Sequence, residues 1–339
     1  MNLPLRLTRE QILSFRRHVG GLDMRLPYGD DSLRRAAWAG LQDSMPRAAL
    51  LSIHARVTGA GPSAWEDPSL IQLWGPRYQV YVVAARDLPV FSLGRLPDDT
   101  KGRQRAIETA ERLHAHLGGR RMSYGDAGHA LGVNPNALRY GTATGTIAIR
   151  WEGARAPVVW TLPSPDLDPL EARLELACRY LHVFGPGTAA SFGTWAGISA
   201  RAATGAFASL EASLTTVRTP IGDAVILADD EPLVRADPRP AATARLLPSG
   251  DAYFLLWGDD RALLVPDAAR RGELWTPRVW PGALLVNGEV SGVWRRAHDT
   301  VSIQTWGPLS TLALEAVDQE AMALPLPGLE GRLRVVMNA

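Results

Sequence analysis

The chain has 339 residues, of which 46% are hydrophobic and 21% charged, and its formal net charge is +1. This composition is ordinary for a soluble globular protein of two or three domains, and it excludes a disordered tail or a coiled coil. The near-neutral charge lacks the basic excess typical of many nucleic-acid-binding proteins. The sequence has no run of about 18 apolar residues and no secretory core near Met1, so we expect a cytoplasmic protein without membrane contact.

Three residue types bear on the available chemistry. Cys178 is the only cysteine, which excludes an intrachain disulfide and a cysteine-based metal site. Lys101 is the only lysine among 36 basic residues, so the other 35 are arginines. Arginine suits bidentate contact with phosphates, although a bias in codon composition explains the same preference equally well. His114 and His116 lie on different faces of an expected helix, and the sequence has no Cys cluster and no His-Glu-x-x-His pattern, so we expect no metal. It has no glycine motif that binds phosphate either, so we expect no other cofactor.

The first motif along the chain is the segment Gly40-Leu41-Gln42-Asp43-Ser44-Met45-Pro46. It follows the alanine-rich end of an expected helix at residues 36–39. Pro46 is suited to the first position of the next helix. The segment is therefore expected to be a loop between two helices, where its glutamine, aspartate and serine can be aimed.

Two later segments share one order of residue types. Leu131-Gly132-Val133-Asn134-Pro135 and Ala196-Gly197-Ile198-Ser199-Ala200 each stop a helix with glycine, continue with an apolar residue and begin a new helix with a capping side chain. A pair of β-type runs follows each segment, and these runs are residues 146–151, 157–162, 214–218 and 224–227. The order of helix, turn, helix and hairpin predicts a winged helix in each case. Gly40-Leu41-Gln42 fits a third copy.

Beyond the proline-rich segment Asp237-Pro238-Arg239-Pro240 the pattern changes to short alternating or apolar runs. These runs are residues 253–257, 262–265, 282–286, 289–294 and 301–306. Turn residues separate them, and the pair Asn287-Gly288 is a strong signal for a tight hairpin. The pattern predicts a mostly β, barrel-like C-terminal domain.

Several motifs resemble those of the AlkZ-like DNA glycosylases, a family of tandem winged-helix DNA-binding proteins. The matching stretches, in the family's order, are Gly40-Leu41-Gln42, residues 46–51, 179–181, 184–186 with Trp195, 245–248 with Asp251, and 287–296. The resemblance implies an α+β fold in which three winged-helix units and a β-barrel surround a concave DNA-binding surface. The expected units are residues 1–98, 99–168 and 169–236, and the expected barrel-like domain is residues 237–339.

In this family the activity depends on a Gln-apolar-Gln or Gln-apolar-Asp motif, whose polar residues help position the water that attacks the sugar. The matching residues here are Gln42, Asp43 and Ser44, and the family's histidine on a later strand corresponds to Tyr81. The resemblance implies a monofunctional DNA glycosylase that hydrolyses the N-glycosidic bond of alkylated bases or base crosslinks. Gln42 would place the water, and Asp43 or Ser44 would assist.

Alternatives remain open for the motif and for the whole chain. Asp43 or Ser44 can instead cap the following helix and take no part in catalysis. The altered motif also fits a non-enzymatic winged-helix protein that regulates or protects DNA, and the low net charge fits winged helices that bind another protein. Asp251 matches a family aspartate and is either a turn former or a residue near the DNA.

The expected partner is double-stranded, damaged DNA, bound by a monomer. Contacts to the DNA backbone supply most of the affinity and need no particular base sequence. Arg139 and Tyr140 lie on the expected second helix of one winged-helix unit, and Arg150 and Arg155 lie on its wing. The other candidates lie near the first motif or follow the C-terminal motif, and they are Arg47, Arg56, Arg295 and Arg296. For each arginine alone, a solvated surface position is the competing interpretation.

Overall fold

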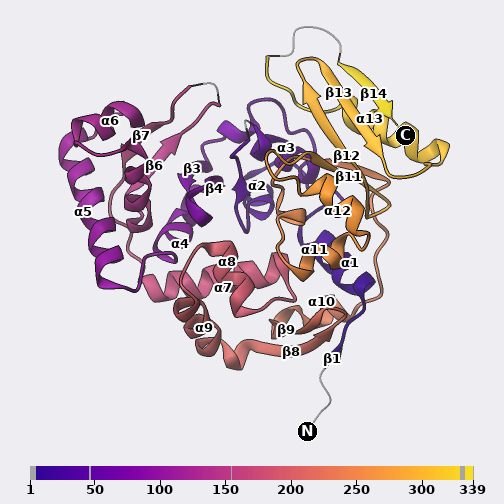
Figure 1. Ribbon diagram of the computed structural model, residues 1–339, viewed down its shortest axis with the longest axis horizontal. Coiled ribbons are helices and arrows are strands. Elements are labelled where there is room, and N and C mark those ends of the chain that lie inside the picture. The colour runs from indigo at the N-terminus through magenta and orange to yellow at the C-terminus, as the bar shows by residue number, and fades with distance from the viewer. Residues whose placement is uncertain (1–4, 46, 154, 329–332, 339) are drawn as a thin grey trace.

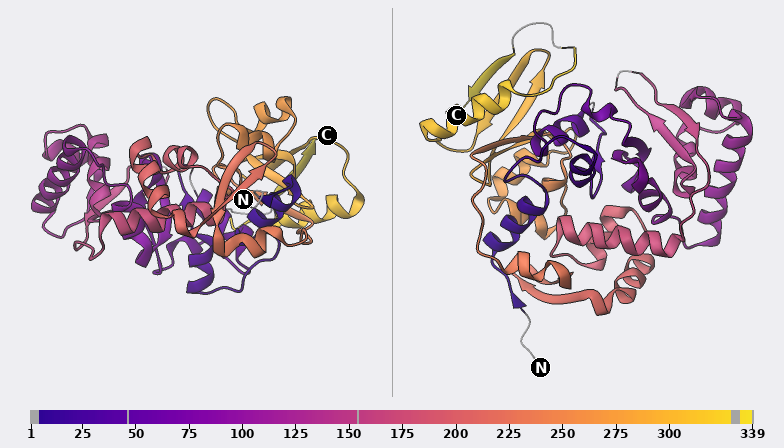
Figure 2. Two further views of the ribbon diagram at one scale, coloured as in Figure 1. Left: turned by 90° about the horizontal axis from the view of Figure 1, so that it is seen from below. Right: turned by 180° about the vertical axis from the view of Figure 1, so that it is seen from behind.

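The computed structural model describes residues 5–45, 47–153, 155–328 and 333–338, so Pro46 and its expected place at the start of a helix lie outside the described residues. The protein has a mixed α+β fold (Figure 1). Seen edge-on, it is elongated, with the segment around residues 100–130 at one end and the C-terminal sheet at the other (Figure 2). No helix among the described residues combines the length and the apolar character needed to cross a membrane.

The first part of the chain combines helices with four short strands. Its elements are β1 (Leu5–Arg6), α1 (Arg9–Val19), α2 (Asp30–Ala36), β2 (Leu41–Gln42), α3 (Ala48–Arg56), η1 (Ala64–Glu66), β3 (Leu70–Trp74), η2 (Pro76–Tyr78), β4 (Val80–Ala84) and α4 (Leu88–Leu93). Helix α1 begins with a capping box in which Thr8 and Gln11 bond each other's backbone N–H groups. Its buried face carries Ile12, Leu13 and Phe15.

Two further parts each contain a helix pair followed by a hairpin, as the sequence predicts. The first comprises α5 (Thr100–Leu117), β5 (Met122–Ser123), α6 (Tyr124–Ala130), η4 (Pro135–Thr144), β6 (Ile147–Arg150) and β7 (Val158–Thr161). The second comprises α7 (Pro169–Phe184), α8 (Ala189–Ala196), α9 (Ala200–Ser209), β8 (Leu214–Thr219), β9 (Gly222–Leu227) and α10 (Glu231–Arg235). Asn134 caps η4 and Ser199 caps α9, each by accepting a backbone N–H bond on its side chain.

The C-terminal part differs from its prediction. Its elements are β10 (Ala244–Leu247), η7 (Ala252–Phe254), α11 (Asp259–Leu264), α12 (Ala268–Leu274), β11 (Gly282–Val286), β12 (Glu289–Ala297), β13 (Thr300–Thr305), α13 (Thr311–Met322) and β14 (Arg334–Asn338). Among the residues that the structure describes here, the strands form an open sheet in the order β10-β11-β12-β13-β14 and not a closed barrel. The strands expected at 253–257 and 262–265 are wrong, because Asp251 caps η7 and two acidic residues favour the first turn of α11.

The remaining sheets connect parts that lie far apart in the sequence. One has six strands in the order β2-β4-β3-β6-β7-β5, and its β3–β6 contact joins the first part to the second. The other has the order β1-β8-β9 and ties the N-terminal strand to the third part. The largest core cluster includes aromatic residues of α7 and α8, such as Tyr180 and Trp195, together with residues of the C-terminal part, such as Phe254. These connections hold the first motif between several parts of the chain.

Candidate active site

The first motif lies between α2 and α3, as expected, and within it Leu41–Gln42 form the short strand β2. Gln42 of β2 pairs with Tyr81 of β4 in an antiparallel register, and the backbone N–H of Asp43 donates to the carbonyl of Val80 at 2.8 Å. Gly40 (φ +74°) turns the chain from the end of α2 into this strand. Side chains alternate along an extended segment, so Gln42 and Asp43 lie on opposite faces.

Three other parts of the chain surround the half-buried side chain of Gln42. Its Oε1 accepts a hydrogen bond from Arg77 Nη2 at 3.3 Å. Arg77 lies in the turn between β3 and β4, donates to the Trp195 carbonyl at 2.8 Å, and places its guanidinium carbon 4.4 Å from the ring centroid of Trp257. A Cβ on Gly250 would lie only 3.3 Å from Gln42 Cδ, so this glycine lets the backbone approach the amide. Gln42 is therefore held in a defined place.

Ser44 makes a contact that the sequence did not suggest. Its hydroxyl donates to Oε1 of Gln79 at 3.0 Å, and both side chains are half-buried. Gln79 precedes β4 and lies opposite Ser44 when the β2–β4 register is extended by two residues. Strand propensity at 80–84 indicates β4, but no local signal shows which segment pairs with it, so Gln79 was missed.

Asp43 is buried on the opposite face, with only 1% of its surface exposed. One carboxylate oxygen accepts from the Ala49 N–H at 3.0 Å, in the first turn of α3, and the other accepts from Gln72 Nε2 at 2.8 Å. Burial raises the pKa of Asp43 to about 7, although both hydrogen bonds favour the charged form. The carboxylate thus makes the helix-capping contact that was one of the alternatives for this residue.

A buried ion pair lies behind Gly250. Asp251 receives two bonds from Arg56, at 2.7 and 2.8 Å, and one from the Ser52 hydroxyl at 2.6 Å. Burial alone would raise the pKa of Asp251, but the Arg56 guanidinium and these hydrogen bonds hold it below its usual value. Arg56 is only 3% exposed, so its guanidinium is directed into this pair rather than toward solvent. The pair anchors the segment that contacts Gln42.

The other predicted DNA-binding residues do not gather in one place. Arg47 and Arg150 place their guanidinium carbons 4.0 and 3.7 Å from the ring centroid of Trp65, which brings the start of α3 and the end of β6 together. Tyr140 packs edge-on against Tyr78 at 5.3 Å. The members not yet placed are Arg139, which is half-buried 6.0 Å from the Trp74 ring, and the exposed Arg155, Arg295 and Arg296.

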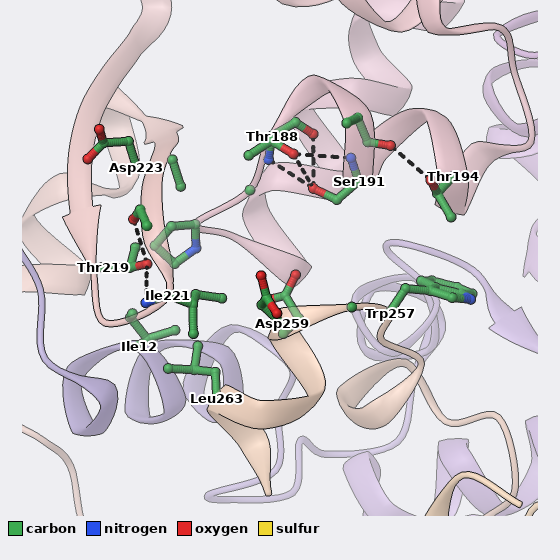
Figure 3. Close-up of a pocket in the computed structure, with 17 residues that line it drawn as sticks. Ile12, Thr188, Ser191, Thr194, Thr219, Ile221, Asp223, Trp257, Asp259 and Leu263 are labelled. Carbon is green, nitrogen blue, oxygen red and sulfur yellow. Dashed lines mark hydrogen bonds between the residues drawn. The ribbon is translucent and has the colours of Figure 1, made fainter. Parts of the chain in front are cut away.

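A cavity of about 430 Å³ adjoins this region, and Trp257 is one of its lining residues (Figure 3). Hydroxyl groups of Thr188, Ser191 and Thr219 line it, together with the carboxylate of Asp259. No arginine or lysine is among the residues that line this cavity, so the lining offers no cation to bind a phosphate. Gln42, Ser44 and Gln79 are not among the lining residues either. Among the described residues, no cluster of three or more His, Cys, Asp and Glu side chains is placed to hold a metal ion.

Comparison with known proteins identifies the class to which this arrangement belongs. Residues 35–325 match a family of DNA glycosylases, which are hydrolases that cleave N-glycosyl bonds in DNA. The family is described as DNA glycosylase AlkZ-like, and the chain belongs to it. The resemblance drawn from the sequence motifs is therefore confirmed, and the substrate is DNA.

Solved structures show the same fold. The DNA glycosylase AlkZ of Streptomyces sahachiroi superposes with a TM-score of 0.79, covering 98% of this chain and 100% of that chain at 17% identity. At this identity the likeness is one of fold. A search of curated proteins found no match.

Proposed function

We propose that this glycosylase hydrolyses the N-glycosidic bond of alkylated bases or base crosslinks in double-stranded DNA, and that it acts as a monomer. We further infer that its three helix–helix–hairpin segments are winged helices. The observation that carries the proposal is the setting of Gln42, whose side chain is half-buried, bonded to Arg77 and packed against Gly250. A polar side chain held from several sides can keep a water molecule in one position.

The chemistry of an alkylated base suits such a site. A purine alkylated on a ring nitrogen is positively charged and leaves the sugar as a neutral base, so protonation by a general acid contributes little. The enzyme has to stabilise a cationic sugar and hold water near it. Gln42 is a weak base but a good hydrogen-bonding partner, so it places the water. Asp43 supports the strand from its buried face, and Ser44 assists on the face of Gln42.

We infer that the enzyme is monofunctional. Glycosylases that also cut the DNA strand attack the sugar with an amine and form a Schiff base. Lys101 is the only lysine, and it is exposed in the first turn of α5. The side chains and backbone described around Gln42, which are those of Arg77, Gly250 and the neighbouring Ser44–Gln79 pair, include no lysine. An abasic site should be the product.

The proposed DNA contacts are Arg47, Arg139, Tyr140, Arg150, Arg155, Arg295 and Arg296. Arg47 and Arg150 are close enough to the motif that their charges partly offset the rise in the pKa of Asp43 caused by burial, and Trp65 brings the two together. Stacking on the indole limits their freedom, so less conformational entropy is lost when they bind phosphate. Arg56 contributes indirectly, by holding Asp251 and thus Gly250 in place.

Single-turnover incubation with duplexes that carry 7-methylguanine or a base crosslink tests the proposal. We expect release of the free base and an abasic product, with no covalent adduct after borohydride reduction. Gln42→Ala should abolish most of the release while leaving DNA binding intact. Salt-dependent binding of DNA without any base release would instead support a protective or regulatory protein and overturn the proposal.

A further inference from the structure

The structure assigns a second carboxamide to the site: we propose that Gln79 holds the attacking water together with Gln42, and that Ser44 is its positioning residue. This inference rests on the proposed function. It differs from the expectation drawn from the sequence, in which the serine itself stands beside the attacking water. The argument depends on the register of one strand pair and one hydrogen bond.

The register brings the two amides to one face of the sheet. Gln42 lies opposite Tyr81, and the bond from Asp43 N–H to the Val80 carbonyl continues the pairing toward Ser44 and Gln79. Gln79 lies two residues before Tyr81, which is opposite Gln42, so Gln79 lies on the face of Gln42. Its hydrogen bond to Ser44 places the serine on the same face. Diagonal neighbours on such a face have α-carbons about 7–8 Å apart, a separation that long side chains can bridge through one water.

Ser44 fixes the orientation of the Gln79 amide. Its hydroxyl donates to Gln79 Oε1 at 3.0 Å, so the amide nitrogen of Gln79 is turned away from the serine. Among the described residues, that nitrogen donates to no protein acceptor, and both side chains are partly open to solvent. Two hydrogens on Gln79 Nε2 are therefore available to an oxygen atom on this face.

Gln42 presents the complementary group. Arg77 donates to its Oε1 at 3.3 Å, which leaves this carbonyl oxygen a second lone pair for a further donor. A water that donates to Gln42 Oε1 and accepts from Gln79 Nε2 keeps one lone pair free. That lone pair forms the bond to the anomeric carbon C1′, and the bond from C1′ to the base nitrogen breaks. The electron pair of the broken bond neutralises the positively charged base, and a proton from the water goes to solvent.

Alanine variants of Gln79 and Ser44 test this arrangement. Single-turnover base release from a 7-methylguanine duplex would be measured alongside the dissociation constant for the same duplex. We expect Gln79→Ala to slow base release about tenfold to a hundredfold with little change in affinity, because a misplacement of about 1 Å can cost a hundredfold. Ser44→Ala should slow release about two- to tenfold, as expected for one hydrogen bond of ordinary strength.

The double variant Ser44→Gln, Gln79→Ser separates a catalytic role from a structural one. It returns a carboxamide to the same face from the opposite strand, so its release rate should exceed that of Gln79→Ala by at least about fivefold, since it restores most of a tenfold or larger loss. Gln104→Ala is the matched control, because Gln104 lies on the exposed face of α5 and, within the described part of the chain, its side chain bonds only Glu108. It should behave as wild type.

The outcomes distinguish this inference from the function on which it rests. If the wild-type protein releases no base, or Gln42→Ala has no effect, the proposed function fails and Gln79 loses its role with it. If Gln42→Ala is inactive while Gln79→Ala matches Gln104→Ala, the second carboxamide alone is refuted. Loss of release in Gln79→Ala without any recovery in the exchanged variant would also overturn it, since a packing role explains that result.

Discussion

The turns at Gly40-Leu41-Gln42 and Gly197-Ile198-Ser199 have the same order of residue types but direct the chain differently. Both glycines adopt positive φ angles, +74° and +72°. After Gly197 the chain enters α9 at once, and the Ser199 side chain accepts from the Ala202 N–H at 3.1 Å. After Gly40 the chain instead forms β2, and α3 begins only at Ala48. Because of this additional strand, Gln42 does not cap a helix as Ser199 does.

The two turns also meet in space. A Cβ on Gly197 would lie 2.9 Å from the backbone nitrogen of Arg77, whose guanidinium reaches Gln42. The turn at Gly197, which joins α8 to α9, therefore packs against the arginine that contacts the proposed site at Gln42. Under the proposed function, the turn at Gly197 has a structural role and the turn at Gly40 a catalytic one, because an additional strand separates Gly40 from the next helix.

The largest expected effect is on base release, when Gln42 of the additional strand β2 is replaced. Gln42→Ala should reduce single-turnover base release by roughly a hundredfold to a thousandfold, the range found when one preorganised hydrogen-bonding group is removed from an active site. Its free energy of unfolding should change by less than about 1 kcal/mol, because the amide makes a single long hydrogen bond to Arg77. Comparable losses of activity and stability would show that Gln42 is a structural residue.

The next prediction compares the glycines of the turns. A Cβ on Gly40 would meet the Tyr81 ring at 2.9 Å and the Phe91 ring at 3.0 Å, and both rings are fully buried. Gly132, in the middle copy, has a φ of +65° and nothing within 4 Å. Both Ala variants incur the cost of a left-handed conformation, roughly 1 kcal/mol. Only Gly40→Ala adds overpacking, about 2 kcal/mol more.

Denaturant unfolding of Gly40→Ala and Gly132→Ala measures that difference. Gly132→Ala is the matched control, because it shares the backbone strain without the crowded neighbours. Equal destabilisation of the two variants would mean that the turn at Gly40 adapts to a Cβ as easily as the turn at Gly132. The close packing of Gly40 against β4 would then contribute nothing to the free energy of unfolding.

A third prediction uses the buried carboxylate beneath the strand. The raised pKa of Asp43, about 7 in the folded protein, means that between pH 4 and pH 7 the folded state binds the proton more tightly than the unfolded state. Stability from this group is therefore lost as pH rises through that window. Relative to Asp43→Asn, wild type should lose on the order of 2 kcal/mol of unfolding free energy between pH 5 and pH 7.

The comparison with Asp43→Asn is needed because His54 changes the free energy of unfolding with pH in the opposite direction. Burial, aided by the nearby Arg25, lowers the pKa of His54 to about 4, so its contribution to stability rises with pH up to about 6.5. Both proteins contain His54, and the difference between them isolates Asp43. A difference that stays constant from pH 5 to pH 7 would place the pKa of Asp43 near its ordinary value.

Local signals were sufficient for the middle and third parts of the fold. A glycine that ends a helix, a capping residue such as Asn134 or Ser199, and two β-type runs determine neighbouring elements without reference to distant residues. At residues 253–257 the apolar pattern predicted a strand, and this prediction was wrong. Tyr253 and Phe254 are instead buried in a helical turn that Asp251 caps. Apolar runs of this length indicate burial but do not distinguish a strand from a helical segment.

The candidate site could be predicted only in part, since it depends on pairing between distant segments. The sequence located Gln42 and Ser44. It gave no means of showing that Asp43 turns inward, because that follows from the pairing of β2 with β4. Arg77, Gln79 and Gly250 lie 35, 37 and 208 residues beyond Gln42, and only the folded chain brings them beside it. Contacts of this kind leave no local signal.

The smallest effect is expected at the turn that lacks the inserted strand. Ser199→Ala removes the capping hydrogen bond of α9 and should lower the free energy of unfolding by about 1 kcal/mol, the usual cost of losing a helix cap. Base release at a temperature well below the midpoint of unfolding should match wild type. Ser199→Asp restores a capping acceptor and should recover the lost stability. If Ser199→Ala slowed base release as well, the support that Gly197 gives to Arg77 would depend on the start of α9, and the structural and chemical roles of the two turns would not be separable.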